Sequence, residues 1–478
     1  MYFGGTTSRD QCGTIGVQGV TGAMASVRVS DVSAMKSYLN TTLVGSATEY
    51  MLPSPARWAN GIASGGDGSV WFGEESVPGL AHLFANGTVI EYRWPGTYSG
   101  PPGDYKAGIW GVAIWKGMVW AADTDGNALV GIDPGSSRVS VINLTGKAEV
   151  PYTLEVSPAG DLWFTSLSSP AKVGKLGTDN CLSVYAIANL GREVPVEMQF
   201  GNSTSGYFVA LDPYSSTGDG HAYAFDLASG RMKASPFGAG LTLYDPDSIS
   251  VADGIAWIAQ HGPSNIVSYN FTSGRWTVWP TSTVGYSTST LPYFVEASGG
   301  KVWFNEHYGN RIGVIDPASR SLTEYSEADP PVSNLTEVHN DLTIATADGG
   351  LWFTSATGNY VGFVDPSRDA GFSMSLVGPR SKGTFPGGNV TFSLMISGTV
   401  AKALGGSFSD SEDQTSVPRL ISSSLDGAYF SLENSSGSLN LEVTVWTSPD
   451  LLPGTYTLAL TISDGLVIET AYATLDVV

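Results

Sequence analysis

The sequence is short of charge, of lysine and of long apolar runs, and each shortage excludes something. Charged residues make up 14% of the 478 residues, only ten are lysine, and 44 acidic against 23 basic residues give a formal net charge of −21. A surface of this sign repels phosphate groups, so we expect no nucleic-acid partner. No stretch approaches the roughly 18 consecutive apolar residues of a membrane-spanning helix, so we expect no transmembrane segment.

Cysteine is also scarce, and the two present are Cys12 and Cys181. An even number, far apart in the sequence, favours one disulfide bond in an exported protein, whereas two unrelated buried thiols are the alternative. The first residues lack the basic and apolar regions of an export signal. Export is nevertheless favoured by eight Asn-X-Ser/Thr triplets, which predict N-glycosylation. They begin at Asn40, Asn86, Asn143, Asn202, Asn270, Asn334, Asn389 and Asn434. We therefore expect an extracellular or cell-surface location.

A repeat of about 47 residues runs through the middle of the chain. Its marker is an aromatic residue, usually Trp followed by Phe, that stands a few residues after a Gly- or Asp-containing turn. Each repeat continues with an apolar strand that often ends in Asp-Pro, and then with a strand such as Leu322-Thr-Glu-Tyr325. The seven markers are Trp71, Trp120, Trp163, Phe208, Trp257, Trp303 and Trp352.

Four short strands in each of seven repeats predict an all-β fold, a seven-bladed β-propeller over residues 46–369. A stacked solenoid is the alternative, but its repeats are usually shorter. Residues 46–52 copy the fourth-strand pattern ahead of the first complete repeat, and the seventh repeat has no such strand of its own. We therefore expect residues 46–52 to close the last blade.

The two ends of the chain have a different pattern. Residues 370–478 contain six or seven short alternating strands without a cysteine pair, which predicts an Ig-like β-sandwich. Residues 1–45 form an N-terminal extension, in which residues 30–39 have the composition of a short capped helix. A Cys12–Cys181 bond would hold this extension against the third blade.

The repeats resemble the blades of streptogramin (virginiamycin B) lyases, which are seven-bladed propellers. The best copy is Trp303-Phe-Asn-Glu306-His-Tyr-Gly-Asn310-Arg-Ile-Gly-Val-Ile-Asp316, and the resemblance covers about two thirds of the chain. It implies a lyase that opens a cyclic lactone by elimination, with a divalent metal held by acidic residues and a His as general base. The seventh repeat has a partial match, Glu337-Val-His339, but Ser355 and Tyr293 stand where a metal-binding Glu and a second His belong. The resemblance therefore predicts the fold better than the activity.

The third residue after each marker occupies an equivalent position in every blade. Carboxylates there predict a Ca²⁺ or Mg²⁺ site at the channel, with Glu74, Glu306 and His339 as ligands and Asp123 beside them. The alternative is that these acids accept hydrogen bonds from turn backbones. The remaining histidines, His82, His221, His261 and His307, form no ligand cluster by spacing. His261 and His307 occupy equivalent positions of adjacent blades, so proximity is one interpretation, but two surface imidazoles are the favoured one.

Aromatic residues open several repeats and form a predicted binding mouth at one end of the channel. They are Trp58, Trp110, Tyr152 and Tyr293. The leading hypothesis is an exported, glycosylated, non-catalytic component of a cell surface, matrix or filament. It would bind a protein or glycan partner or assemble with itself through the sandwich or the N-terminal segment. The alternatives are a metal-dependent lyase or hydrolase at the channel mouth, and a lectin-like receptor that uses the mouth aromatics.

Overall fold

The computed structural model describes most of the chain, with gaps in the N-terminal segment, several loops and part of the C-terminal region. The described residues are 26–29, 33–52, 58–94, 108–187, 190–202, 205–215, 219–226, 232–238, 243–282, 290–327, 341–356, 358–368, 372–399, 404–410, 422–423, 429–430, 436–463 and 466–478. In this part of the chain the only helix is the 3₁₀ turn η2 (Pro366–Arg368), and everything else is strand or connection. No helix there is long and apolar enough to cross a membrane.

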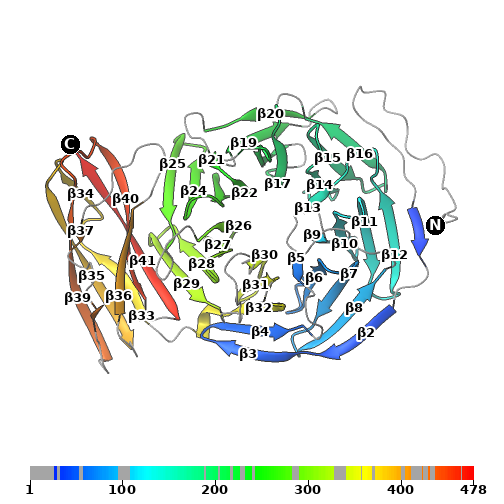
Figure 1. Cartoon of the computed structure of the whole chain (residues 1–478), viewed down its shortest axis with the longest axis horizontal. Coiled ribbons are helices and arrows are strands. Elements are labelled where there is room, and N and C mark those ends of the chain that lie inside the picture. The colour runs from blue at the N-terminus through cyan, green and yellow to red at the C-terminus, as the bar shows by residue number, and fades with distance from the viewer. Residues whose placement is uncertain are drawn as a thin grey trace.

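Seven antiparallel sheets stand around a central axis as the blades of a β-propeller (Figure 1). The first strand of each blade lies innermost, and the chain then runs outward. Blade 1 contains β5 (Ala59–Ser64), β6 (Val70–Glu74), β7 (Gly79–Leu83) and β8 (Thr88–Arg93). Blade 2 contains β9 (Ile109–Trp115), β10 (Met118–Asp123), β11 (Ala128–Asp133) and β12 (Arg138–Asn143). Blade 3 contains β13 (Pro151–Val156), β14 (Leu162–Ser166), β15 (Lys172–Leu176) and β16 (Leu182–Ala186).

The remaining blades repeat this order. Blade 4 contains β17 (Val194–Phe200), β18 (Ser205–Leu211), β19 (Asp219–Asp226) and β20 (Lys233–Pro236), and β21 (Leu243–Tyr244) also pairs with β19. Blade 5 contains β22 (Pro246–Ala252), β23 (Ile255–Gln260), β24 (Asn265–Asn270) and β25 (Arg275–Pro280). Blade 6 contains β26 (Pro292–Ser298), β27 (Lys301–Glu306), β28 (Arg311–Asp316) and β29 (Ser321–Ser326). Blade 7 contains β30 (Asp341–Ala347), β31 (Gly350–Ser355), β32 (Tyr360–Val364) and, from the N-terminal side, β4 (Ala47–Met51).

The repeat pattern follows from how the second and third strands of a blade pack. The Phe after the marker Trp lies over a Gly of the third strand, as Phe304 does over Gly313 and Phe353 over Gly362. A Cβ atom added to either glycine would come within 2.1 Å of the aromatic ring. The Phe side chain therefore requires glycine opposite it, which explains the recurring Ile-Gly-Val type of third strand.

The N-terminal strands follow the rim of the propeller. Strand β4 pairs with β32, at the place where the repeats predict the closing strand, and β3 (Asn40–Val44) pairs with β4. Strands β2 (Ser33–Tyr38) and β1 (Ser26–Val29) then extend blades 1 and 2 as fifth strands. The short helix expected within residues 30–39 is therefore wrong. The exposed edge strand β8 binds this segment as β2, and pairing along the sheet outweighs the local helical tendency.

A C-terminal sandwich follows the propeller. One sheet contains β33 (Phe372–Val377), β35 (Asn389–Thr399), β37 (Ser422–Ser423) and β39 (Ser436–Trp446). The other contains β34 (Ser381–Thr384), β36 (Leu404–Asp410), β38 (Tyr429–Phe430), β40 (Gly454–Ser463) and β41 (Val467–Val477). Apolar side chains of both sheets, among them Phe392, Val443, Leu460 and Ala473, form one buried core.

The sandwich and the propeller share a sheet. Strand β41 pairs antiparallel with β29, the outer strand of blade 6, so hydrogen bonding continues from one unit into the other (Figure 1). Tyr472 of β41 is fully buried, contacts Trp279 of blade 5 edge-on at 5.2 Å between ring centroids, and donates a hydrogen bond to the Pro280 carbonyl at 2.7 Å. The described parts of the two units therefore pack as one body.

Candidate functional site

The entrance to each blade has a recurrent backbone geometry. In five blades the residue before the first strand has a positive φ, as Val150, Asp245 and Leu291 do at 54°, 51° and 52°. In all seven blades the pairing of the first two strands shifts register close to this point. A left-handed residue followed by a bulge redirects the next side chains. Because the strain recurs from blade to blade, it belongs to the architecture and does not mark one blade as a site.

A second recurrent contact fixes the residue that follows each second strand. The N–H of His261 donates to the Asp245 carbonyl at 2.9 Å, and the N–H of His307 donates to the Leu291 carbonyl at 2.9 Å. Equivalent bonds occur in blades 1, 2 and 3. His261 and His307 are thus placed by the backbone, each beside the opening of its own blade.

Three of the four predicted mouth aromatics meet at the axis. Trp110 stacks on Tyr152 with 5.0 Å between ring centroids, and Tyr293 lies edge-on to Trp110 at 6.4 Å. The hydroxyl groups of Tyr152 and Tyr293, from blades 3 and 6, lie 2.7 Å apart and share a hydrogen bond. All three side chains are buried, and Trp58 packs against the same cluster while partly exposed. The sequence placed these residues together, but their rings face one another instead of lining an open mouth.

Blade 5 contributes acids and a histidine beside this aromatic group, and we call Asp245, Asp247, His261 and His307 the mouth cluster. His261 Nδ1 lies 3.1 Å from Asp245 Oδ2 and 3.7 Å from Asp247 Oδ2, and its Nε2 lies 3.1 Å from His307 Nδ1. The two imidazole rings stack at 5.3 Å between centroids, and each also lies against the ring of Tyr293. His261 and His307 therefore lie in contact, and the favoured interpretation of two surface imidazoles is wrong for this pair.

Burial disfavours negative charge in the mouth cluster. Asp247 is only 7% exposed, and burial together with the nearby charges of Asp245 and Glu197 raises its pKa well above the ordinary value. Burial, reinforced by the charge of Asp247, likewise raises the pKa of Tyr152 well above its usual range, so its hydroxyl stays protonated at neutral pH. The site places two protonated tyrosine hydroxyls next to the side chains of Asp245 and Asp247.

Below the mouth the axial channel holds three glutamates on first strands, Glu155, Glu197 and Glu296. They border a cavity of about 340 Å³ that first strands of all seven blades line. The Ile249 N–H donates to Glu197 at 2.9 Å, and the N–H and hydroxyl of Thr346 donate to Glu296. Burial raises the pKa of Glu155 to about 7 and that of Glu197 to about 8. The channel is thus acidic and holds protons near neutral pH.

The acids predicted as metal ligands lie inside separate blades. Glu74 is buried at the end of β6, and Glu306 at the end of β27 accepts a hydrogen bond from the Thr290 hydroxyl at 2.7 Å. Asp123 accepts from the Trp94 indole and the Gly126 N–H, as the turn-bonding alternative predicts. Among the described residues, neither Glu74 nor Glu306 joins a group of three possible metal ligands. His339 lies outside the described residues.

The other two histidines are isolated. His82 stacks on Trp71 at 4.0 Å between ring centroids, and burial lowers its pKa to about 4. His221 contacts Glu193 on the surface of blade 4, with 2.6 Å between Nδ1 and Oε1. Neither belongs to a larger group of ligands in the described structure.

Sequence reasoning missed Asp245 and Asp247 and followed the wrong residue after each marker. The third residue, Glu306 in blade 6, turns into its blade, whereas the fourth, His307, reaches the mouth. A test of both positions, together with the Asp-Pro-Asp that opens blade 5, would have marked Asp247 and His261 as candidates, although the contact between them depends on the bulge in β22.

Solved structures with this fold include streptogramin lyases. A streptogramin B lyase matches with 21% sequence identity and a TM-score of 0.52, over 66% of this chain and 96% of that one. A catalytically inactive virginiamycin B lyase from Staphylococcus aureus, in a structure with quinupristin, matches with 18% identity and a TM-score of 0.51, over 66% and 98%. No protein-family model and no curated protein matches the chain. The resemblance to these lyases is confirmed for the fold, and at this identity it carries no activity with it.

Proposed function

We propose that this chain is an exported, glycosylated component of a cell surface, matrix or extracellular filament, which binds a protein or glycan partner and is not a catalyst. The contact between the Tyr152 and Tyr293 hydroxyls carries this proposal. The side chains of Tyr152, Tyr293 and Trp110 pack together at the channel mouth, where the resemblance expects the catalytic groups. Tyr293 stands where the resemblance expects a second histidine. A fold kept without its catalytic groups fits a protein used for its surface.

The geometry of three glycosylation triplets supports export. The side-chain oxygens of Asn86, Asn143 and Asn270 accept hydrogen bonds of 2.8–3.0 Å from the N–H two residues later, which belongs to the Thr of the same triplet. These Asx turns direct the amide nitrogen away from the backbone. Asn86 and Asn143 are exposed and Asn270 is partly exposed, as attachment of a glycan requires.

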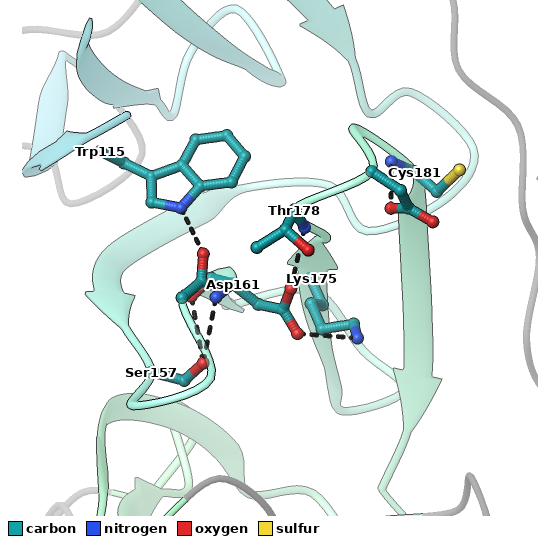
Figure 2. A network of polar contacts seen from close by, with 8 residues as sticks. Trp115, Ser157, Asp161, Lys175, Thr178 and Cys181 are labelled. Carbon is teal, nitrogen blue, oxygen red and sulfur yellow. Dashed lines mark hydrogen bonds and ion pairs between the residues drawn. The ribbon is translucent and has the colours of Figure 1, made fainter. Parts of the chain in front are cut away.

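We infer a disulfide bond between Cys12 and Cys181 as part of this proposal. Cys181 precedes β16 at the outer edge of blade 3, and its N–H donates to Asp179 at 3.0 Å, which fixes the turn. Its side chain points away from the neighbouring Asp161 network (Figure 2). Cys12 lies outside the described residues.

The surroundings of Cys181 give a rigid attachment point. Asp161 accepts hydrogen bonds from Lys175 Nζ at 3.0 Å and from the Thr178 N–H at 2.9 Å, while the Trp115 indole of blade 2 donates to the Gly160 carbonyl at 2.6 Å (Figure 2). These bonds hold the β13–β14 turn against the β15–β16 turn and join blade 3 to blade 2. A bond at Cys181 would therefore anchor the N-terminal segment to a fixed frame and, in the chain-entropy model, stabilise the fold by about 3–5 kcal/mol.

Self-assembly would use the ends of the molecule. The N-terminal strands β1 to β3 already extend three blades, so this segment pairs readily with sheet edges, and the described strands β16, β20 and β25 form the outer edges of blades 3 to 5. Addition of a strand to such an edge is a general way to join subunits. An Ig-like assignment for the sandwich belongs to the same proposal.

The proposal is tested on native material from the cell surface or medium. Glycopeptide mass spectrometry should find glycans at Asn86, Asn143 and Asn270, and electron cryomicroscopy should find polymers or partner-bound particles. A non-glycosylated monomer with measurable turnover of a small substrate would overturn it.

A metal-dependent lyase or hydrolase remains a second candidate, favoured by the mouth cluster, where two carboxylates and two imidazoles adjoin a tyrosine pair. The sequence-based version of this candidate uses Glu74, Glu306 and His339. Loss of turnover in Glu306→Gln would support that version, whereas loss in Asp247→Asn with Glu306→Gln active would move the chemistry to the mouth cluster.

A further inference from the structure

Blade 5 brings three possible metal-ligand atoms close together beside the channel mouth. One carboxylate oxygen from Asp245, one from Asp247 and one ring nitrogen of His261 all lie within 4.8 Å of one another. Among the described residues this is the single group of three such side chains that comes so close. We propose that Asp245, Asp247 and His261 bind one divalent transition-metal ion of the Zn²⁺ type.

The side chain of Asp247 is the main reason. It is 7% exposed, and no described residue donates a hydrogen bond to its carboxylate. The nearest basic atom is His261 Nδ1 at 3.7 Å, beyond hydrogen-bond distance. A buried carboxylate beside a second carboxylate needs a positive charge or a proton, and a cation between Asp245, Asp247 and His261 would bind to all three.

The backbone prepares this arrangement before any ion binds. Asp245 has a φ of 51°, a conformation that Asp tolerates better than most residues, and its carbonyl accepts the His261 N–H. Asp247 is the residue that the bulge at the start of β22 leaves unpaired, because Pro246 pairs with Gln260 and Ser248 with Ala259. Both acids and the histidine are therefore fixed on strand ends and not on a long loop, which favours a defined coordination geometry.

His307 would complete the site from the neighbouring blade without binding the ion. When His261 Nδ1 binds the metal, its Nε2 carries the proton and can donate to His307 Nδ1, 3.1 Å away. Metal-binding histidines almost always donate their second N–H in this way, and the partner fixes both ring orientation and tautomer. His307 is thus a positioning residue for His261.

The donor set selects the class of ion. Ca²⁺ prefers six to eight oxygen ligands, and Mg²⁺ prefers oxygen in an octahedral shell with several waters. Two carboxylates and one imidazole suit Zn²⁺ and its neighbours, with a water in the remaining position. This differs from the Ca²⁺ or Mg²⁺ expected at Glu74 and Glu306, and it does not depend on whether the protein is a catalyst.

Blade 4 offers a matched control. His221 and Glu193 form a histidine–carboxylate contact of 2.6 Å. Among the described residues, no second carboxylate joins them in a group of three possible ligands. If any histidine next to an acid bound Zn²⁺ in this protein, His221 would do so as well as His261.

The experiment uses the full chain, free of affinity tag and stripped with a chelator. Zn²⁺ is titrated calorimetrically, and Co²⁺ is added separately to record the visible absorption of a bound, low-symmetry ion. We expect one equivalent of Zn²⁺ and a rise in apparent Tm on binding, because the ion binds the folded state. Asp247→Asn and His261→Gln should each weaken binding at least about 100-fold and remove the Tm rise, and His307→Gln should weaken it about 10- to 100-fold.

The controls keep folding and binding apart. His221→Gln should bind like the parent, and millimolar Ca²⁺ or Mg²⁺ should leave the Co²⁺ spectrum unchanged. Asp247→Asn removes one charge from a carboxylate pair, so the metal-free variant should unfold at the same temperature as the parent or higher. The proposal is overturned if Zn²⁺ does not saturate, if Asp247→Asn and His261→Gln bind normally, or if Ca²⁺ displaces Co²⁺. If Asp247→Asn fails to fold, His261→Gln decides.

Discussion

Two pairs of carboxyl groups in neighbouring blades have opposite surroundings. Glu306 and Glu324 lie inside blade 6, where Arg311 provides a positive charge and Thr290 and the Ser282 N–H donate hydrogen bonds. The Asp245–Asp247 pair in blade 5 has, among the described residues, only His261 as a basic neighbour. Burial alone therefore does not identify a binding site. The compensation differs: Arg311 on β28, together with hydrogen-bond donors from the segment that joins blades 5 and 6, satisfies the structural acids.

The largest expected effect on stability is the removal of the Arg311 charge from beside Glu306 and Glu324. Arg311 is 7% exposed and also donates to the Ser282 carbonyl at 3.2 Å. Arg311→Leu leaves two buried acids without their cation, so we expect a loss of about 3–5 kcal/mol in the free energy of unfolding, measured by chemical denaturation. Arg138→Leu on the exposed face of β12 should change it by less than about 0.5 kcal/mol. If Arg311→Leu and Arg138→Leu change the free energy of unfolding equally, Arg311 does not compensate the Glu306–Glu324 pair.

The Glu306–Glu324 pair should also make the free energy of unfolding depend on pH. Burial and the charge of Glu306 raise the pKa of Glu324 well above its ordinary value, so above about pH 4.5 the unfolded chain releases a proton that the folded protein keeps. The parent therefore loses stability as pH rises through this window. Glu324→Gln does not titrate and can still donate to Glu306, so at pH 8 it should be more stable than the parent by about 1–3 kcal/mol and nearly equal at pH 4. Parallel pH profiles would contradict the assignment, and the exposed Glu442→Gln is the control.

The smallest expected effect on stability concerns the hydrogen bond between the Tyr152 and Tyr293 hydroxyl groups. Tyr152→Phe and Tyr293→Phe each remove the shared hydroxyl contact, and each should cost about 0.5–1.5 kcal/mol. Because both lose the same hydrogen bond, the double variant should cost clearly less than the sum of the two single variants. Strict additivity in thermal or chemical unfolding would mean that the hydroxyl groups bind something other than each other.

Much of the propeller was predictable because each repeat must solve the same packing problem. The marker Trp-Phe and the Gly opposite Phe353 fix the second and third strands of the blade. The β2 strand was not predictable, because Ser33–Tyr38 pairs with an edge fifty to sixty residues away. The pairing of β29 with β41 was hidden for the same reason: no local pattern records which sheet edge an outer strand will find.

The candidate site was harder to predict than the fold. Spacing alone brought Trp110, Tyr152 and Tyr293 to one mouth, but it could not show that their rings would pack together. Asp245 precedes β22 and Asp247 lies in the bulge at its start, and this bulge, which the sequence does not reveal, decides which side chain faces the axis.

The closing strand also sets the order in which this protein can fold. Blade 7 unites β4, made within the first fifty-one residues, with β32, which ends at Val364. During synthesis the early strand must therefore wait, unpaired on that side, until six blades have been made. Contacts over such a sequence distance slow folding. Until the ring closes, the free edge of β4 can pair with a strand of another chain. The β3–β4 hairpin is therefore the segment most exposed to such pairing during synthesis.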